Sequence, residues 1–222
     1  MSCGRRCGLC GSEPAEKSRR FPHRGRGGGS KILGITGGTG CGKTTLLKTI
    51  EEKGGLILDC DAIYHQLLQR DRGLLNAIET RFPGTVENGV LQRKKLGALV
   101  FSDENALLDL NKITHSAVKA EVLRQLESRP KLAAIDAIAL FEGGLAELCD
   151  VTVAVTAPAE VRVQRLMKRD GISEDYARSR IAAQHEESWF RERCGYVLEN
   201  NGTEIQFYGK CLAFLSEAGI IV

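Results

Sequence analysis

The stretch Lys31-Ile-Leu-Gly-Ile-Thr-Gly37-Gly-Thr-Gly-Cys-Gly42-Lys43-Thr44-Thr45 decides the fold. A short apolar run leads into closely spaced glycines, and a helical pattern of leucines and isoleucine follows. Gly37, Gly42, Lys43 and Thr44 have the spacing of a phosphate-binding loop between a strand and a helix. Lys43 is expected to reach the β- and γ-phosphates of a nucleotide, and the Thr44 hydroxyl can bind Mg²⁺.

The residues expected to hold the nucleotide form one continuous set: Gly38, Thr39, Gly40, Cys41, Gly42, Lys43, Thr44 and Thr45. Glycines permit positive φ, which brings backbone N–H groups close to phosphate oxygens. The N-terminus of the following helix adds about half a positive charge. A glycine-rich turn that matches by chance is the alternative, and the strand before it and the helix after it argue against that.

Length and composition suit one α/β domain, with room for a small insertion. The chain has 222 residues, of which 27% are charged and 5% are aromatic, and its formal net charge is +3. This balance argues against a nucleic-acid-binding surface. No apolar run is long enough to span a bilayer, and the eight cysteines lack the spacing of a disulfide framework. We therefore expect a cytoplasmic protein with reduced thiols and with no nucleic-acid or membrane partner.

Residues 1–30 are predicted to form a disordered leader, and residues 31–222 to form the folded domain. The leader has almost no apolar periodicity and ends in Gly27-Gly28-Gly29-Ser30, which is typical of a flexible linker. Cys3, Cys7 and Cys10 have a spacing that could bind an iron–sulfur cluster or begin a zinc site. A disordered leader is the favoured interpretation, because no partner fold for such a centre follows.

The second strand, over residues 56–58, is followed by two acidic residues, Asp59 and Asp61. Side chains alternate along a strand, so both carboxylates share one side if the extended chain continues. Carboxylates at the C-terminal edge of a parallel strand lie where ligands bind in open α/β sheets. We interpret Asp61 as a candidate proton acceptor beside the phosphates. A helix N-cap is the alternative for either residue, because residues 62–69 have a helical pattern.

A helical block separates the second strand from the third. Residues 62–129 carry apolar stripes at helical spacing, interrupted at Phe82-Pro83-Gly84 and at Glu87-Asn88-Gly89. Such a block suits an inserted subdomain that binds the acceptor of the phosphoryl group. His115 lies within it, and composition alone favours a capped or solvated histidine at that position.

The third strand, over residues 131–136, ends in Asp136. In phosphate-loop enzymes an aspartate so placed supports Mg²⁺, and a helix cap is the alternative. Residues 150–155 and 195–198 are expected to form the remaining strands, and Thr203 is expected to cap a final helix. The pattern predicts an α/β fold.

Two basic helices over residues 159–194 are predicted to form a mobile lid. The first helix carries Arg162, Arg165, Lys168 and Arg169, and the two helices meet at Asp170-Gly171. Such arginines can neutralise charge on a transferring phosphoryl group, and lid closure excludes water. A solvated charged face with acidic partners is the alternative.

Together these segments resemble the dephospho-coenzyme A kinase family, and the resemblance extends from Lys31 to the C-terminus. Beyond the phosphate loop it rests on Leu58-Asp-Cys-Asp61, Ile113-Thr-His115, Leu140-Phe-Glu142, Arg165-Leu-Met-Lys-Arg-Asp-Gly171, Arg180-Ile-Ala-Ala-Gln184 and Asn201-Gly202. It implies a three-layer phosphate-loop kinase fold with a parallel five-stranded sheet. It also implies a helical acceptor-binding insertion over about 62–129 and a helical lid over about 159–194.

The resemblance implies transfer of the ATP γ-phosphoryl group to the ribose 3′-hydroxyl of dephospho-CoA, the last step of coenzyme A biosynthesis. ATP and Mg²⁺ would be the cofactors. The implied catalytic residues are Asp61, Lys43 and Arg165. Thr44 and Asp136 would lie at the metal. Further contacts to the nucleotide are implied for Arg169, Asn201 and Gly202. Contacts to the acceptor are implied for Asp61, His65, His115, Phe141 and Glu142.

Three positions depart from the family pattern. His65 stands where Arg is usual, Ser116 where Pro is usual, and Ile138-Ala139 where Pro-Leu is usual. None of them lies in the phosphate loop or at Asp61. Two alternatives stay open: another small-molecule kinase, acting on a nucleoside or a sugar, and a non-catalytic nucleotide-binding switch. We expect dephospho-CoA as the small-molecule partner and a monomer or weak homo-oligomer.

Overall fold

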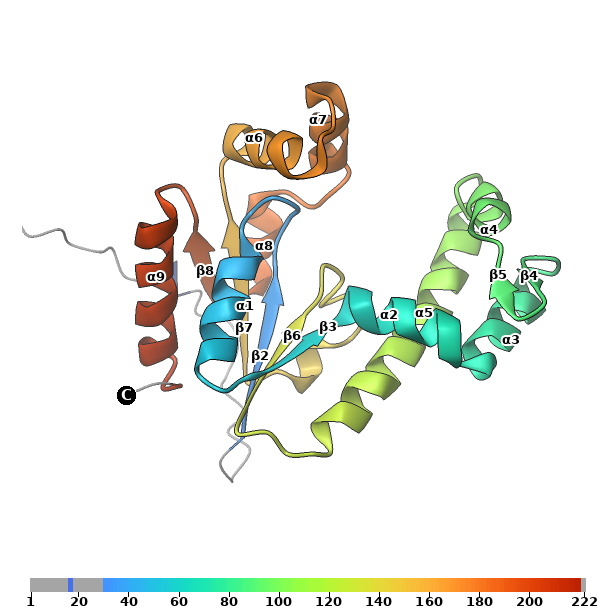
Figure 1. The fold of residues 1–222 in the computed structure, drawn as a ribbon, viewed down its shortest axis with the longest axis horizontal. Helices are drawn as coiled ribbons and strands as arrows, with labels where there is room; N and C mark the ends of the chain where they lie inside the picture. Colours follow the sequence, from blue (N-terminus) through green and yellow to red (C-terminus); the bar gives the residue numbers. More distant parts are fainter. Residues whose placement is uncertain (1–15, 18–29, 221–222) are drawn as a thin grey trace, which may run out of the picture.

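The computed structural model of the chain describes residues 16–17 and 30–220. Its centre is a sheet with the strand order β1-β8-β7-β2-β6-β3 (Figure 1). The strands are β1 (Glu16–Lys17), β2 (Lys31–Thr36), β3 (Leu56–Asp59), β6 (Leu132–Asp136), β7 (Val151–Thr156) and β8 (Tyr196–Glu199). The last five run parallel to one another, as predicted.

The short strand β1 was not predicted. Glu16–Lys17 lies within the leader that was expected to be disordered, yet it pairs antiparallel with Tyr196 and Val197 of β8. An edge strand presents unpaired N–H and C=O groups that any extended segment can pair with, and sequence patterning carries no signal for so short a pairing. Cys3, Cys7 and Cys10 lie outside the described residues.

Helices cover both faces of the sheet, which gives the three layers that the resemblance implied. On one face, α1 (Lys43–Glu52) and α9 (Glu204–Glu217) bury Leu46, Ile50 and Phe214 against β2, β7 and β8. On the other face lie α5 (Glu104–Leu126) and α8 (Glu187–Arg193), with Val122 and Phe190 in their cores. A short 3₁₀ helix, η1 (Ala146–Leu148), precedes β7.

The insertion between β3 and β6 has a core of its own. It consists of α2 (Cys60–Arg70), α3 (Arg72–Arg81), α4 (Arg93–Val100), α5 and a small hairpin. The predicted break at residues 87–89 is the turn of that hairpin, between β4 (Val86–Glu87) and β5 (Val90–Leu91). Asn88 and Gly89 both have positive φ, 52° and 76°, and an Asn-Gly pair favours this kind of two-residue turn.

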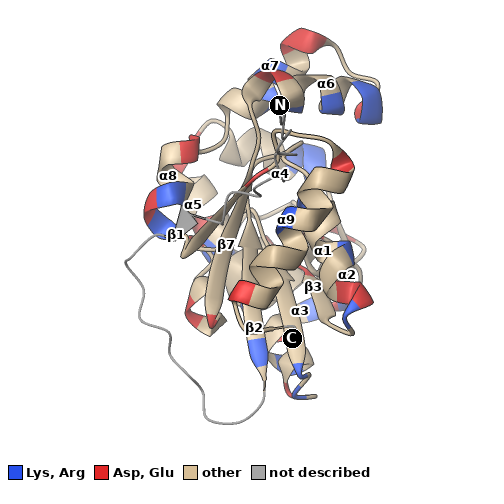
Figure 2. Cartoon of the chain, turned by 90° about the vertical axis from the view of Figure 1, so that its left-hand side faces the viewer, with Lys and Arg blue, Asp and Glu red and all other residues tan. Residues whose placement is uncertain are grey.

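Two helices stand away from the sheet, above the phosphate loop in the view of Figure 1. They are α6 (Ala159–Asp170) and α7 (Glu174–Ala182), which pack on each other through Val163, Leu166 and Ala177. Figure 2 shows basic residues recurring along α6. The predicted lid also included α8, but Phe190 of that helix packs against Ala154 and Val197 of the sheet.

The predicted helix caps are partly confirmed. Thr203 caps α9 and forms a capping box with Gln206, and Ser173 caps α7. Within the described part of the chain, the helices are all too short or too polar to cross a membrane.

Truncating Phe214 should test the packing of α9 on the sheet. Its side chain is 1% exposed and meets Tyr196 edge-on at a centroid distance of 5.1 Å. Because the cavity left behind can collapse only partly, we expect Phe214→Ala to lower the free energy of unfolding by about 3–5 kcal/mol. Ile205→Ala on the same helix is the matched control, since Ile205 is 84% exposed. Urea unfolding measures both, and an equal loss in the two variants would contradict this packing.

Candidate active site

The loop between β2 and α1 can exist only because glycine occupies particular positions. Gly37 has φ +132°, and a Cβ built on it would lie 2.2 Å from the Val155 carbonyl oxygen. Gly42 is the N-cap of α1 with φ +95°, and a Cβ there would lie 2.2 Å from Nδ2 of Asn200. Side chains at these positions would displace the loop from β7 and β8. The glycines therefore fix the loop against the carboxyl end of the sheet.

Lys43 and Thr44 occupy the first turn of α1, where backbone N–H groups are free to bind an anion. The Lys43 ammonium group donates to the Gly37 carbonyl oxygen at 2.9 Å, so it lies across the loop. Thr44 is exposed at the helix start. Cys41 is buried, and burial raises the pKa of its thiol, so its backbone rather than its thiolate is suited to the site.

The acidic residues after β3 adopt a different arrangement from the one predicted. The strand ends at Asp59, and α2 begins at Cys60, so Asp61 lies in the first helical turn and not on an extended strand. Asp59 is the N-cap, and its Oδ1 accepts from the Ala62 N–H at 2.9 Å. The cap thus belongs to Asp59, which leaves the exposed carboxylate of Asp61 available for chemistry.

Asp136 lies directly beside Asp59 in the pairing of β6 with β3. Its Oδ1 is buried and has no hydrogen-bond partner among the described residues. Burial raises the pKa of Asp136 to about 6, the charges of Asp59 and Asp61 act in the same direction, and the Lys43 ammonium opposes them. A buried carboxylate oxygen with no hydrogen-bond partner would be stabilised by a bound cation.

The residues present therefore fit a magnesium ion. Mg²⁺ in phosphate-transfer sites takes one or two carboxylates together with oxygens of its substrate, not a full protein cage. Asp136 and the Thr44 hydroxyl would supply the protein ligands. The described residues contain no group of three or more His, Cys, Asp or Glu side chains placed to hold a metal by themselves.

Two arginines of α6 hold the backbone of the phosphate loop. Arg162 Nε donates to the Thr39 carbonyl at 2.8 Å. Arg165 donates to the Gly40 and Cys41 carbonyls at 3.3 and 3.4 Å. Arg169, predicted to contact nucleotide, instead pairs with the adjacent Asp170, and its side chain is 60% exposed. Of the two α6 arginines predicted in the site, the structure thus brings only Arg165 to the loop.

The segment after β8 approaches the loop through Asn200, which was not predicted as a site residue. Its amide Nδ2 donates to the Cys41 carbonyl at 2.9 Å, and its Oδ1 accepts from Arg165 at 3.1 Å. Asn201 and Gly202, the predicted nucleotide contacts, follow it and are exposed. Lys210 of α9 reaches Oδ1 of Asn201 at 3.2 Å. Asn201 and Gly202 are therefore accessible beside the loop.

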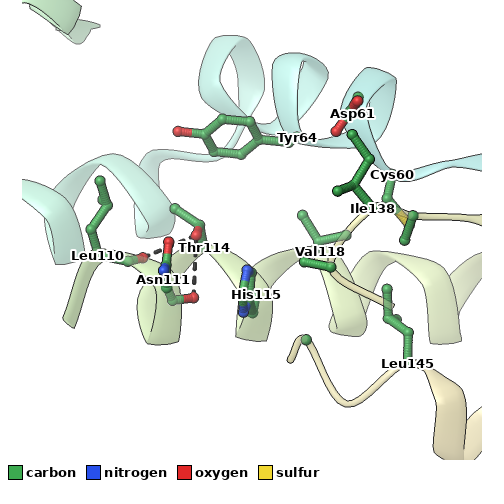
Figure 3. A pocket seen from close by; sticks show the side chains of 13 residues that line it. Cys60, Asp61, Tyr64, Leu110, Asn111, Thr114, His115, Val118, Ile138 and Leu145 are labelled. Carbon is green, nitrogen blue, oxygen red and sulfur yellow. Dashed lines mark hydrogen bonds between the residues drawn. The ribbon is translucent and has the colours of Figure 1, made fainter. Parts of the chain in front are cut away.

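A cavity of about 250 Å³ lies between α2, α5 and the segment after β6. Asp61 and Tyr64 line it from α2, and His115 faces them from α5 (Figure 3). The remaining lining residues are Cys60, Leu110, Asn111, Thr114, Val118, Ala137, Ile138, Ala139, Gly143 and Leu145. This is a concave, largely apolar site with a few polar groups, which is the usual form of a small-molecule pocket.

The other predicted acceptor residues do not line the cavity. His65 is exposed on α2, with Nδ1 2.8 Å from the Asp61 carbonyl oxygen. Phe141 packs edge-on against Trp189, and Oε1 of Glu142 lies 2.8 Å from His185 Nε2. These two side chains therefore contact the segment around α8, because the turn after β6 directs them away from the cavity.

The family model for dephospho-CoA kinase matches residues 31–206. The chain belongs to the dephospho-CoA kinase family. It is an ATP-dependent phosphotransferase, and the reaction of this family lies in coenzyme A biosynthesis.

Relatives and solved structures agree with this membership. A dephospho-CoA kinase from Lactobacillus johnsonii is 34% identical over 194 residues, which are 85% of this chain and 98% of the relative. The crystal structure of TT1252 from Thermus thermophilus is 33% identical with a TM-score of 0.73, covering 86% of this chain and 98% of that one. Dephospho-CoA kinase from Campylobacter jejuni, at 22% identity and a TM-score of 0.59 over 84% of this chain and 96% of that one, shares the fold.

Some residues that contact the site were only partly indicated by the sequence. Arg162 was predicted as one of the lid arginines and Gln184 belongs to a motif of the family resemblance, but their contacts to Thr39 were not predicted. Tyr64 lies one helical turn from Cys60 on the cavity side of α2, and the periodicity of that helix could have indicated it.

The raised pKa of Asp136 predicts how stability changes with pH in metal-free buffer. Because its folded-state pKa of about 6 exceeds the ordinary value of 3.8, the folded protein binds the extra proton between these values. The stabilisation that comes from protonating Asp136 in the folded state is therefore complete at low pH and is lost as pH rises through 6. Asp136→Asn should exceed wild type in unfolding free energy at pH 7.5, by at most about 3 kcal/mol.

The gain should shrink toward pH 4.5, where the folded wild type is already protonated. Urea unfolding of both proteins at the two pH values, in the presence of a chelator, measures the difference. A gain that is the same at both pH values would contradict the assignment.

Proposed function

We propose that this chain transfers the ATP γ-phosphoryl group to the ribose 3′-hydroxyl of dephospho-CoA, with Asp61 as the proton acceptor. The observation that carries the proposal is the position of Asp61. Its carboxylate lines the acceptor cavity, and its charge also acts on Asp136, which Lys43 of the phosphate loop influences as well. These two relations support a role for Asp61 in which it accepts a proton from the acceptor beside the nucleotide.

In the proposed reaction, the hydroxyl oxygen attacks the γ-phosphorus while the bond from that phosphorus to the β–γ bridging oxygen breaks. The hydroxyl proton passes to Asp61, and ADP leaves with the bridging oxygen. Asp61 is exposed, so it can release the proton to water. The transition state of such transfers is loose, and catalysis consists mainly of positioning and charge stabilisation.

Charge on the phosphates would be met by N–H groups of the phosphate loop and of the first turn of α1 that have no partner within the described part of the chain, by the Lys43 ammonium and by Arg165. Thr44 and Asp136 would hold Mg²⁺, which when bound neutralises phosphate charge. Asn201, Gly202 and Arg169 stay as predicted nucleotide contacts. For Arg169 this requires its pair with Asp170 to open.

His115 faces Asp61 across the cavity and is proposed to contact the acceptor. His65, Phe141 and Glu142 stay as predicted acceptor contacts, although their side chains lie outside the cavity lining. A location in the cytoplasm and a monomer or weak homo-oligomer also remain predictions.

The direct test mixes purified protein with MgATP and dephospho-CoA and follows coenzyme A by mass and ADP by a coupled assay. Both products should accumulate in equal amounts. Nucleosides and sugars serve as rival acceptors under the same conditions. ATP turnover with one of these, and none with dephospho-CoA, would contradict the proposed acceptor.

Lys43→Ala should lower kcat by several orders of magnitude, roughly 10³-fold or more, because it removes charge that is needed most in the transition state. Lys48→Ala on the exposed face of α1 is the matched control, and it should leave kcat within about twofold, as expected for a surface position. Steady-state kinetics measures both. Comparable losses in the two variants would indicate a general effect on α1 and not a role for the Lys43 ammonium.

Asp61→Asn should lower kcat by roughly 10²- to 10⁴-fold, the usual range for loss of a general base. Its affinity for ATP should stay close to that of wild type, because Asp61 contacts the acceptor side. Turnover assays and calorimetric titration with an ATP analogue measure the two quantities. Asp59→Asn is the control, because it changes the neighbouring carboxylate. Undiminished turnover of Asp61→Asn would show that Asp61 is not the proton acceptor.

A further inference from the structure

Two consecutive residues after α7, Gln184 and His185, contact the two halves of the site. Gln184 reaches the nucleotide half. Its Oε1 accepts from the Thr39 N–H at 2.9 Å and from Arg162 at 2.7 Å. Arg162 in turn donates to the Thr39 carbonyl at 2.8 Å. The N–H group of Thr39 thus donates to Gln184, which follows α7, and its carbonyl oxygen accepts from Arg162 of α6.

His185 reaches the acceptor half. Its Nε2 lies 2.8 Å from Oε1 of Glu142, and its ring stacks on Trp189 at a centroid distance of 3.9 Å and an interplanar angle of 2°. Glu142 is followed directly by Gly143, which lines the acceptor cavity. The Gly143 N–H donates to the Ala139 carbonyl at 2.8 Å within the same turn, and both residues line the cavity.

The phosphate loop and the turn after β6 are far apart in sequence. The adjacent residues Gln184 and His185 connect them, since one contacts Thr39 and the other contacts Glu142. Any displacement of Thr39 on nucleotide binding moves the hydrogen-bond partner of Gln184. The backbone that Gln184 shares with His185 connects the Thr39 contact to Glu142, which precedes Gly143 of the cavity wall. The Trp189 ring on which His185 stacks also meets the ring of Phe141 edge-on, and the Arg193 guanidinium lies over it at 4.4 Å from its centroid.

We propose that Gln184 and His185 are positioning residues that couple ATP binding to acceptor binding. The inference rests on the proposed function, from which it takes its two ligands. Neither side chain need touch a reacting atom. By linkage, ATP strengthens acceptor binding by the same factor as the acceptor strengthens ATP binding. The factor should be modest, because the side chains of His185 and Glu142 are 48% and 40% exposed.

The test measures the Kd of dephospho-CoA by calorimetry with and without a saturating, non-hydrolysable ATP analogue and Mg²⁺. In wild type we expect the analogue to tighten binding by about fivefold, at the lower end of typical couplings. His185→Leu removes the hydrogen bond to Glu142. The ratio of the Kd without the analogue to the Kd with it should then fall to about one. His185→Gln, whose amide can still donate to Glu142, should restore part of the ratio. Glu186→Gln, an exposed neighbour, is the matched control and should keep the wild-type ratio.

The outcomes separate the two proposals. An unchanged ratio in His185→Leu, or a wild-type ratio of one, would overturn the coupling while leaving the proposed function intact. Failure of wild type to bind dephospho-CoA at all would overturn the proposed function and the coupling with it. If His185→Leu does not fold, as judged by its thermal melt, His185→Gln and Gln184→Ala carry the test.

Trp189 offers a second readout, because it is the single tryptophan of the sequence and it stacks on His185. The emission of an indole depends on the groups against its ring. Saturating ATP analogue without acceptor should change the emission of wild type, and Gln184→Ala should lose that change at saturation. An emission change that persists in Gln184→Ala would contradict transmission through this residue.

Discussion

The close approach of a glycine-rich loop to neighbouring backbone is the constraint on which the rest of this structure depends. Gly37 lies where a Cβ would almost coincide with the Val155 carbonyl oxygen, and Gly42 lies against Asn200. The chain can therefore turn sharply from β2 into α1 and still remain against β7 and the end of β8. This turn directs the N-terminal amides of α1, with Lys43, at the point where the parallel strands end.

The same edge of the sheet concentrates negative charge. Asp59 and Asp136 lie side by side on paired strands, with Asp61 one turn into α2. Buried Asp136 would be more stable as a neutral carboxylic acid, and only cations reduce that cost. Lys43 supplies one positive charge, and a bound Mg²⁺ would supply more. The fold thus gives up stability at this position to hold a ligand site.

The acceptor side shows how one helix start serves two purposes. Asp59 satisfies the N–H groups at the start of α2, so Asp61 is released from capping and its carboxylate can line the cavity. Across the cavity, α5 of the insertion contributes His115. The phosphate loop and the cavity are therefore formed by different segments of the chain. Two consecutive residues connect these segments. Gln184 contacts the phosphate loop at Thr39, and His185 contacts Glu142 beside the cavity.

The sequence by itself determined the elements whose causes are local. The spacing from Gly37 to Thr44 specified the loop, short apolar runs specified the strands, and Thr203 specified the start of the last helix, because each depends on a few neighbouring residues. The family resemblance, carried by ordered motifs, supplied the activity. Only the tertiary structure decided which arginine reaches the loop, that Asp59 rather than Asp61 is the cap, that Glu142 contacts His185, and that β1 pairs with β8. Apart from the Asp59 cap, which is a local contact, these contacts join residues distant in the chain. Their geometry is set by how the layers pack, which local patterning does not encode.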